Sequence, residues 1–226
     1  MIKDLINLIF PDLCVLCAGD LAKTEQKVCL QCDYLLPKTW FWDFHDNPLY
    51  TSLNGRVRLC HASAFLFFRK KNRVQQLLHL LKYQGDQELG VELGRRFAHH
   101  LRSTAVLQDA NLLVPVPLHP SKQLLRGFNQ SESIVRGISE VLDVNYDTEL
   151  LRRSIANPSQ TRRSRYERWE NVDGIFMLST LRPLTDTHIV LVDDVFTTGA
   201  TIEACIHALK KVNIRKLSVV TLAYSE

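Results

Sequence analysis

Residues 189–201 of this chain read IVLVDDVFTTGAT, an apolar run followed by two acids and then a loop of threonine and glycine. The run from Ile189 to Val192 is uninterrupted, as expected for a strand that is buried on both faces of a parallel sheet. Asp193 and Asp194 follow it directly, and Ala200 begins a segment with the apolar spacing of a helix. We therefore expect a strand, a short loop and a helix, with two carboxylates where open α/β sheets bind their ligands.

The loop offers two kinds of contact to a ligand. Backbone N–H groups from Thr197 to Thr201, with a helix N-terminus behind them, can hold a phosphate, and Gly199 permits close approach. The two carboxylates cannot bind phosphate, but they suit vicinal hydroxyls or a divalent cation. A phosphate site beside a diol site describes a 5-phosphorylated ribose. The alternative is a plain capped turn, which would not require paired acids before this loop.

Alternating strands and helices are predicted around this stretch. Strands are expected at 64–68, 112–116, 174–178, 188–192 and 217–222, and helices at 74–81, 89–101, 131–142 and 200–212. A polar loop is expected between the strand that ends at 116 and the helix that begins at 131. This alternation predicts an α/β fold, with a parallel sheet and helices on both faces.

Four of the six cysteines form two pairs, Cys14-x-x-Cys17 and Cys29-x-x-Cys32. A two-residue spacer lets both thiolates of a pair reach one tetrahedral ion, so the pairs predict a structural Zn²⁺ site with four cysteine ligands. The alternatives are two disulfides or unrelated free thiols, and disulfides are rare in reducing compartments. Cys205 has the helical spacing of a core residue, and Cys60 with His61 is a weak candidate for a further ligand pair.

Three regions are expected along the chain. Residues 1–36 hold a short amphipathic helix at 2–9 and the cysteine module, 37–59 form a linker or packing arm, and 60–226 form the α/β domain. The aromatic stretch 40–54 is expected to be irregular, because Pro48 and Gly55 break regular structure. Its aromatic side chains are expected to cover the body of the α/β domain.

Composition excludes several classes of protein. The chain has 226 residues, 46% of them hydrophobic and 23% charged, with a net charge of +4. These values exclude collagen-like and disordered chains. No apolar run reaches the roughly 18 residues of a membrane span, and the N-terminus has no secretory signal pattern. We therefore expect a cytoplasmic protein.

One segment, from 152 to 168, is strongly basic: six arginines stand against the single acid Glu167. Tyr166 and Trp169 are interleaved with these arginines, and such a mixture can neutralise phosphates and stack unpaired bases. A solvated basic face is the alternative. The candidates for contact with single-stranded DNA are Arg162, Arg163, Arg165, Tyr166, Arg168 and Trp169.

Residues 189–201 resemble the phosphoribosyl pyrophosphate (PRPP) signature of type I phosphoribosyltransferases. Over nearly its whole length the chain is similar to the ComF (ComFC, GntX) family of competence-associated, phosphoribosyltransferase-like proteins. Beyond the signature, the likeness rests on Phe10-Pro11 before a Cys-x-x-Cys pair, LKYQGD at 81–86, VPVPLH at 114–119, RGFNQ at 126–130, and PSQT at 158–161 leading to Arg168-x-x-Asn171-Val172.

The resemblance implies a type I phosphoribosyltransferase fold and a set of site residues. Asp193 and Asp194 would hold the ribose hydroxyls, and with Arg126, which would contact phosphate, they are the catalytic candidates. Asn129 and Gln130 would either cap a helix or contact the substrate, and residues 152–171 fall where related enzymes carry a flexible loop. The remaining PRPP contacts would fall on Val195, Phe196, Thr197, Thr198, Gly199, Ala200 and Thr201, and on Pro115, Val116 and Lys82.

The resemblance also implies a function. We expect a ComF-like protein that binds PRPP with Mg²⁺ and handles incoming single-stranded DNA during natural transformation, with the cytoplasmic DNA-uptake machinery as its partner. The alternative is an active phosphoribosyltransferase, similar to the amidophosphoribosyltransferases, that displaces pyrophosphate at the anomeric carbon of ribose. A regulator that senses PRPP without turnover is a third interpretation. No acceptor is identified by the sequence.

Overall fold

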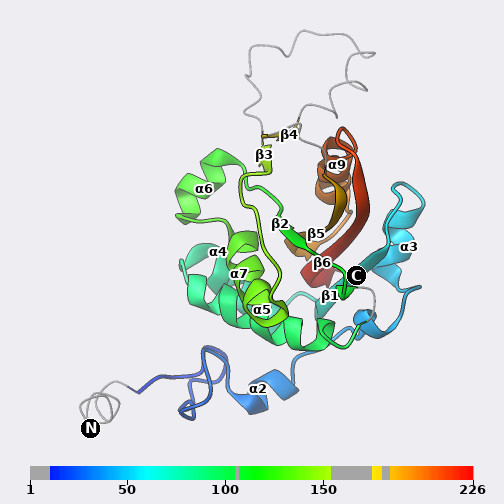
Figure 1. Cartoon of the computed structure of the whole chain (residues 1–226). Coiled ribbons are helices and arrows are strands. Elements are labelled where there is room, and N and C mark those ends of the chain that lie inside the picture. The colour runs from blue at the N-terminus through cyan, green and yellow to red at the C-terminus, as the bar shows by residue number, and fades with distance from the viewer. Residues whose placement is uncertain (1–10, 105–106, 154–174, 180–183, 226) are drawn as a thin grey trace.

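The computed structural model describes residues 11–104, 107–153, 175–179 and 184–225. Its helices are α2 (Leu30–Tyr34), the 3₁₀ turn η1 (Phe41–Asp43), α3 (Pro48–Asn54), α4 (Arg73–Tyr83), α5 (Gln87–Leu101), α6 (Pro120–Arg126), α7 (Gln130–Leu142) and α9 (Ala200–Leu209). Its strands are β1 (His61–Phe68), β2 (Leu112–Pro115), β3 (Leu151–Arg153), β4 (Phe176–Leu178), β5 (Leu184–Phe196) and β6 (Ile214–Ser225) (Figure 1). The helix predicted at 2–9 and the DNA-contact candidates from Arg162 to Trp169 lie outside the described residues.

The main sheet has four parallel strands in the order β1-β6-β5-β2. Leu191 of β5 stands opposite Val114 of β2 on one side and Val219 of β6 on the other. All three side chains are buried, which explains the unbroken apolar run in β5. The parallel α/β arrangement predicted from the sequence is therefore present, and β3 and β4 form a separate antiparallel pair.

Helices cover both faces of the sheet. Val190 and Val192 of β5 pack into the cluster formed with α4, α5 and α7, whereas Ile189 and Leu191 pack into the cluster formed with α3 and α9. Figure 1 shows α4, α5 and α7 grouped on one side of the sheet and α9 on the other. Alternate side chains of one central strand thus supply both layers of the core.

The crevice of the fold lies between β2 and β5. The chain leaves β2 through α6 and α7, and α7 packs on the face covered by α4 and α5. It leaves β5 through α9, which packs on the opposite face. Adjacent parallel strands that send their helices to opposite faces open a ligand-binding crevice at their carboxyl ends. The paired acids lie at this point.

Two helices occupy segments that were expected to be irregular. In α3, Pro48 begins the helix rather than breaking structure, because Asn47 caps it by accepting the N–H of Tyr50 at 3.0 Å and proline suits the first helical position. In α6, Pro120 plays the same part after the capping residue His119. The expectation of a polar loop from 117 was wrong for this reason, and so was the irregular stretch 40–54.

The aromatic arm packs as expected. The side chains of Phe41 and Trp42 are buried, and Trp42 lies 6.1 Å, ring centroid to ring centroid, from both Phe65 and Phe97 of the α/β domain. Cys205 is fully buried within α9, as its helical spacing predicted. None of the described helices combines the length and the apolar character needed to cross a membrane.

Candidate functional site

Asp193 and Asp194 lie inside β5, which runs on to Phe196 instead of ending before the acids. The Asp193 carboxylate accepts the hydroxyl of Ser131 at 3.1 Å and the backbone N–H of Asp194 at 2.9 Å. The Asp194 carboxylate forms an ion pair with Lys82, whose Nζ lies 2.8 Å from Oδ2. Each acid is therefore held by a residue that is remote in sequence.

The pKa of Asp193 is perturbed by its surroundings. Burial raises the pKa of Asp193 to about 7, and the charge of Asp194 adds to the rise, against the opposing effects of the Asp194 N–H, Ser131 and Lys82. Two adjacent carboxyl groups in a partly buried site gain from any ligand that donates hydrogen bonds or brings positive charge. The vicinal hydroxyls of a ribose and a divalent cation both meet that requirement.

The loop after β5 depends on Gly199. Its φ of +79° lies in the left-handed region, and a Cβ there would meet the Phe196 ring at 2.9 Å and Arg56 Nη2 at 3.0 Å. Arg56 holds the loop by donating to the Thr198 carbonyl at 3.0 Å and to Glu203 at 2.8 Å. Gly199 supplies no side-chain cap to α9, and the N–H of Ala200 donates to Thr198 Oγ1 at a long 3.4 Å. The N-terminus of this ten-residue helix would favour an anion.

The signature residues divide between core and surface. Thr197, Thr198, Ala200 and Thr201 are exposed, and Val195 is half-buried. Phe196 is buried and stacks on Tyr224 with ring centroids 5.7 Å apart. Its side chain is therefore part of the core, and only the backbone at Phe196 can take part in ligand contact.

The LKYQGD and RGFNQ motifs meet beside the acids. Lys82, in the last turn of α4, pairs with Asp194. The next residue, Tyr83, lies under Arg126, whose guanidinium carbon is 5.7 Å from the ring centroid. Arg126 also donates to Gln130 Oε1 at 2.8 Å. Two motifs that are far apart in the sequence are thus joined through Arg126, which contacts Tyr83 of one and Gln130 of the other.

Asn129 joins α7 to β2. Its side chain accepts the N–H of Ser131 at 3.1 Å as the cap of α7, and it donates to the Val116 carbonyl at 3.0 Å. The N–H of Val116 is also engaged, by the Val192 carbonyl at 2.9 Å, and Pro115 has no N–H. Neither residue therefore has a free backbone donor for pyrophosphate, and a donor from this loop must come from residues beyond Pro117.

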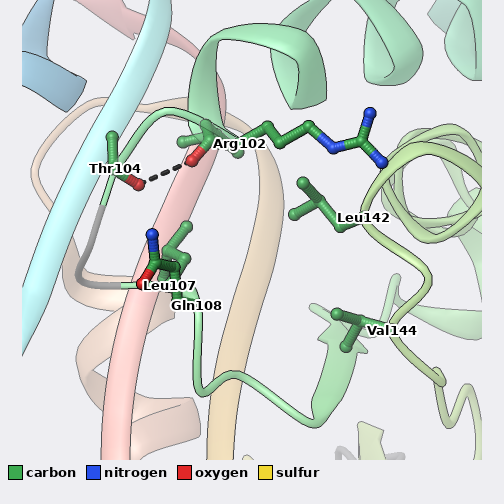
Figure 2. Close-up of a pocket in the computed structure, with 7 residues that line it drawn as sticks. Arg102, Thr104, Leu107, Gln108, Leu142 and Val144 are labelled. Carbon is green, nitrogen blue, oxygen red and sulfur yellow. Dashed lines mark hydrogen bonds between the residues drawn. The ribbon is translucent and has the colours of Figure 1, made fainter.

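A cavity of about 180 Å³ lies near the C-terminal ends of α5 and α7 (Figure 2), and neither acid lines it. It is lined by three leucines, one valine, Thr104, Gln108 and Arg102. Thr104 is internally satisfied, since its hydroxyl donates to the Leu101 carbonyl at 2.6 Å. With one exposed arginine and mostly aliphatic walls, this cavity has no arrangement of groups that indicates chemistry.

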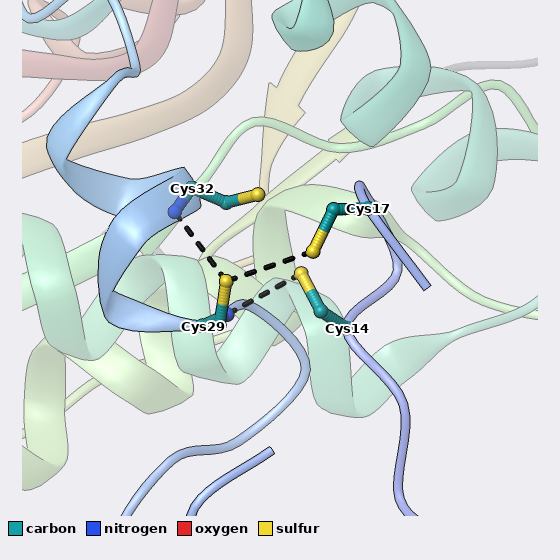
Figure 3. A group of neighbouring side chains, drawn as sticks. All are labelled: Cys14, Cys17, Cys29 and Cys32. Carbon is teal, nitrogen blue, oxygen red and sulfur yellow. Dashed lines mark hydrogen bonds between the residues drawn. The ribbon is translucent and has the colours of Figure 1, made fainter. Parts of the chain in front are cut away.

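The four paired cysteines converge (Figure 3). Their sulfur atoms all lie within 4.8 Å of one another, and they are the one such group among the residues that the structure describes. Cys17 and Cys29 Sγ are 3.8 Å apart, which matches the roughly 3.8 Å edge of a tetrahedron with Zn–S bonds of about 2.3 Å. The four cysteines could therefore hold a structural metal ion, and Cys60 with His61 is not part of the group.

The cysteine module docks on α4 and α5 through polar contacts. Lys27 pairs with Asp86 at 2.9 Å, Arg96 with Asp33 at 3.1 Å, and Gln76 donates to the Val15 carbonyl at 2.9 Å. Asp86 is also the cap of α5. The last residue of the LKYQGD motif therefore contacts the cysteine module, whereas Lys82 of the same motif pairs with Asp194.

Sequence reasoning missed several of these residues. Ser131 and Arg56 contact the signature from positions 62 and 142 residues away in sequence. Tyr83, with Lys82, was expected either to end a helix or to contact a ligand, and its contact with Arg126 was not predicted. The neighbourhood of Ser131 was flagged by the RGFNQ motif that precedes it. For Arg56 no motif in the sequence marks the contact.

Comparison with known proteins supports the predicted phosphoribosyltransferase-like fold. Residues 129–226 match the model of the phosphoribosyl transferase domain family. DNA utilization protein YhgH of Escherichia coli K12 is 35% identical over 129 residues, which are 56% of this chain and 56% of that protein. The match thus spans little more than half the length of that relative.

Two further relatives carry competence in their names. Competence protein F of Haemophilus influenzae is 28% identical over 65% of this chain and 66% of its own, and competence protein ComFC of Bacillus subtilis is 28% identical over 80% and 77%. A hypoxanthine phosphoribosyltransferase structure from Staphylococcus aureus aligns with a TM-score of 0.35 at 14% identity over 63% of this chain and 65% of that one, too low to add to the argument. The family match and the parallel sheet flanked by helices confirm the predicted type I phosphoribosyltransferase fold.

Proposed function

We propose, from the premise that this chain is a ComF-family phosphoribosyltransferase-like protein, that its α/β domain binds PRPP together with Mg²⁺. The observation that carries the proposal is the convergence of Lys82 and Ser131 on the Asp193-Asp194 pair. Such a pair is costly to bury without a ligand that uses it. It stands beside the N-terminus of α9, which the N-cap residue Gly199 leaves without a side-chain cap and which suits a phosphate.

Each part of PRPP has a fitting partner. The ribose hydroxyls would donate to Asp193 and Asp194, and the N–H groups of residues 197–201 would donate to the 5-phosphate. Arg126, held in place by Tyr83 and Gln130, would face the diphosphate. Mg²⁺, when bound there, supplies charge neutralisation to the diphosphate oxygens. The oxygen donors around the acids suit such a hard cation.

Calorimetric titration with PRPP and MgCl₂ tests this proposal. We expect saturable binding, and loss of at least 100-fold in affinity in the Asp193→Asn/Asp194→Asn variant, since neutral amides remove the charge on which the site depends. The Asp186→Asn/Asp143→Asn variant removes the same charge from residues outside the site and should bind normally. Equal affinity in both variants would refute the site, and release of pyrophosphate during the titration would favour the enzymatic alternative.

We propose further that the chain acts in DNA uptake or utilization in the cytoplasm. The support comes from the names of the relatives, which refer to DNA utilization and to competence, and from the basic segment that holds Arg162 and Arg165 with Tyr166 and Trp169. Single-stranded DNA is the ligand that such a segment suits. The DNA-uptake machinery would be the partner.

Fluorescence anisotropy with a labelled oligothymidine tests the DNA proposal. Affinity should fall steeply with salt, because phosphate contacts release counterions. Arg162→Ala/Arg165→Ala should weaken binding about tenfold or more, whereas Arg102→Ala/Arg136→Ala, which removes two exposed arginines elsewhere, should not. Binding that ignores both salt and the first pair of substitutions would overturn the assignment.

We also assign a structural Zn²⁺ to Cys14, Cys17, Cys29 and Cys32. The sulfur spacing supports four thiolate ligands around one ion. In this division of the chain, residues 1–36 form the metal module, 37–59 the packing arm and 60–226 the phosphoribosyltransferase-like domain.

A further inference from the structure

Helix α4 extends from the group of four cysteines to the paired acids. Its first residue, Arg73, donates from Nη1 to Cys32 Sγ at 3.7 Å. Near its other end, Lys82 pairs with Asp194 at 2.8 Å. At about 1.5 Å per residue, the helix spans roughly 14 Å between these two positions. A single helix therefore has a polar contact with each of the two sites.

The position of Arg73 is unfavourable for an arginine in helical terms alone. The positive end of the helix dipole lies at the N-terminus, and the first turn of α4 holds no acid that would compensate a cation there. Asn72 already caps the helix, since its side chain accepts the N–H of Gln75 at 3.0 Å. A cysteine sulfur that binds a metal ion does so as a thiolate, and Cys32 would then supply the compensating negative charge. Residues that break a local rule are expected where function requires them.

The sulfur that Arg73 contacts is buried. Cys32 is 2% exposed, and it lies in the same core cluster as Leu77 and Leu81 of α4. Water cannot stabilise a thiolate in such a place, so hydrogen-bond donors of the protein have to balance its charge. The guanidinium group of Arg73 brings both a donor and a full positive charge to this sulfur. Arg73 therefore belongs to the surroundings of the metal group, although it lies outside the cysteine module.

A second contact ties α4 to the cysteine module. Gln76, one turn after Arg73 on the same face of the helix, donates to the Val15 carbonyl at 2.9 Å. Val15 follows Cys14 directly, so this contact also depends on the fold of the module. Apolar packing holds α4 against the sheet but is not directional. The polar contacts at Arg73, Gln76 and Lys82 fix the rotation of the helix and its position along its own axis.

We propose that metal binding by the four cysteines positions Lys82 at the acid pair through α4, with Arg73 as the positioning residue at the metal end of the helix. The proposal deepens the proposed function, on which it rests, because it names a regulation of the PRPP site. Coupling between two binding sites is reciprocal. Metal binding should therefore tighten PRPP binding, and PRPP with MgCl₂ should tighten metal binding by the same factor.

Cobalt substitution tests the metal end of α4 without any use of PRPP. Co²⁺ bound by cysteines gives a sulfur-to-metal charge-transfer band, and loss of a hydrogen bond to a thiolate moves this band to lower energy. The band should shift in Arg73→Gln, and Zn²⁺ affinity, measured by competition with a chelator, should fall about tenfold or more. Arg73→Lys keeps a cationic donor and should restore most of the affinity. Lys70→Gln removes an exposed cation from the turn before α4 and should resemble the wild type in both measurements.

Hydrogen exchange tests whether the acid end of α4 depends on the metal group. The N–H of Gln84 donates to the Leu80 carbonyl at 3.0 Å and closes the last turn of the helix, beside Lys82. Exchange of this amide should become at least fivefold faster after metal removal. It should become faster also in the Zn²⁺-loaded Arg73→Gln/Gln76→Ala variant, which keeps all four cysteines and so remains informative if the metal-free module unfolds. Calorimetry with PRPP and MgCl₂ should show at least fivefold weaker binding in the same two samples.

The outcomes distinguish this proposal from the proposed function. An unshifted charge-transfer band with unchanged Zn²⁺ affinity in Arg73→Gln would overturn the role of Arg73. Exchange at Gln84 that is unchanged by either metal removal or the double substitution would overturn the link through α4, and so would equal PRPP affinity with and without the metal. A wild type that binds no PRPP would refute the proposed function instead, and exchange at Gln84 would then decide whether metal binding positions the end of α4 that carries Lys82.

Discussion

Lys82 Nζ lies 2.8 Å from Asp194 Oδ2, and the two side chains are only 22% and 16% exposed. The contact joins the end of α4 to the carboxyl end of β5, two elements that are more than a hundred residues apart in sequence. In an ion pair that is mostly buried, each charge compensates the other, and removal of one partner leaves the other as an uncompensated charge. Lys82 therefore organises the acid pair rather than simply ending a helix.

Lys82→Met should weaken PRPP binding at least tenfold in calorimetry with MgCl₂. Without the ammonium group, which lowers the pKa of Asp193, that carboxyl is protonated more readily and accepts ribose hydroxyls less well, and Asp194 loses its cationic partner. Lys210→Met removes an exposed lysine at the end of α9 and should leave the affinity unchanged. Unaltered affinity in Lys82→Met would mean that the ion pair serves only the fold.

Gly199→Ala should abolish PRPP binding and lower the free energy of unfolding by about 1–3 kcal/mol, the usual cost of backbone strain. The added methyl group would meet Phe196 and Arg56, and φ is +79°. Gly55→Ala is the matched control, since φ there is −70° and nothing lies within 4 Å of the new Cβ. Urea unfolding measures the stability of both variants. A Gly199→Ala protein that keeps full stability and affinity would show that the loop tolerates a side chain.

Metal analysis of the purified protein should find about one Zn²⁺ per chain, and the Cys17→Ser variant should contain much less zinc. The Cys60→Ser variant alters a cysteine outside the group and should keep the ion. Because a small module like this depends on its metal to fold, removal should also increase hydrogen exchange at Val28 and at the start of α5, where Lys27 pairs with Asp86. Exchange that is unchanged after complete removal would show that the module folds without metal.

The sequence predicted those features that depend on local patterns. Apolar periodicity located β5, α5 and α7, and cysteine spacing located the group of four neighbouring cysteines. One error arose because proline can either break or begin a helix: Pro48 was treated as a breaker, although it begins α3. A second error concerned a strand end, since the acids were placed after a strand that continues through them.

The contacts that complete the site could not be predicted in the same way. Ser131 and Arg56 reach the signature because α7 and α3 pack on opposite faces of one sheet. That arrangement depends on the order of the strands, which no local pattern in the sequence specifies.

His61 should make the folded protein sensitive to mild acid. Its side chain is 1% exposed, and neither ring nitrogen has a hydrogen-bond partner among the described residues. Its neighbour His188, by contrast, contacts Asp109 and Ser218 at 2.8 Å each. Burial lowers the pKa of His61 to about 4, and the charges of His45 and His188 contribute.

The direction of the pH effect on stability follows from the protonation of His61 in the folded and the unfolded state. The folded protein keeps His61 neutral, whereas the unfolded chain binds a proton below the ordinary pKa of about 6.5. The stability that His61 contributes is therefore fully present above pH 6.5 and is lost as the pH falls toward 4, by about 2 kcal/mol at pH 5. Asp193, whose pKa is raised, acts in the opposite direction, so the wild type alone cannot isolate the effect of His61.

Urea unfolding of the wild type and of His61→Leu at pH 7.5 and pH 5.0 isolates the contribution of His61 to the pH dependence of stability. Other titrating groups contribute equally to both proteins, so the difference between their stability losses belongs to His61. We expect the variant to lose about 2 kcal/mol less than the wild type over this range. His99→Gln, at an exposed position on α5, should follow the wild type. Equal losses in wild type and His61→Leu would mean that His61 is protonated in the folded state as readily as in the unfolded chain.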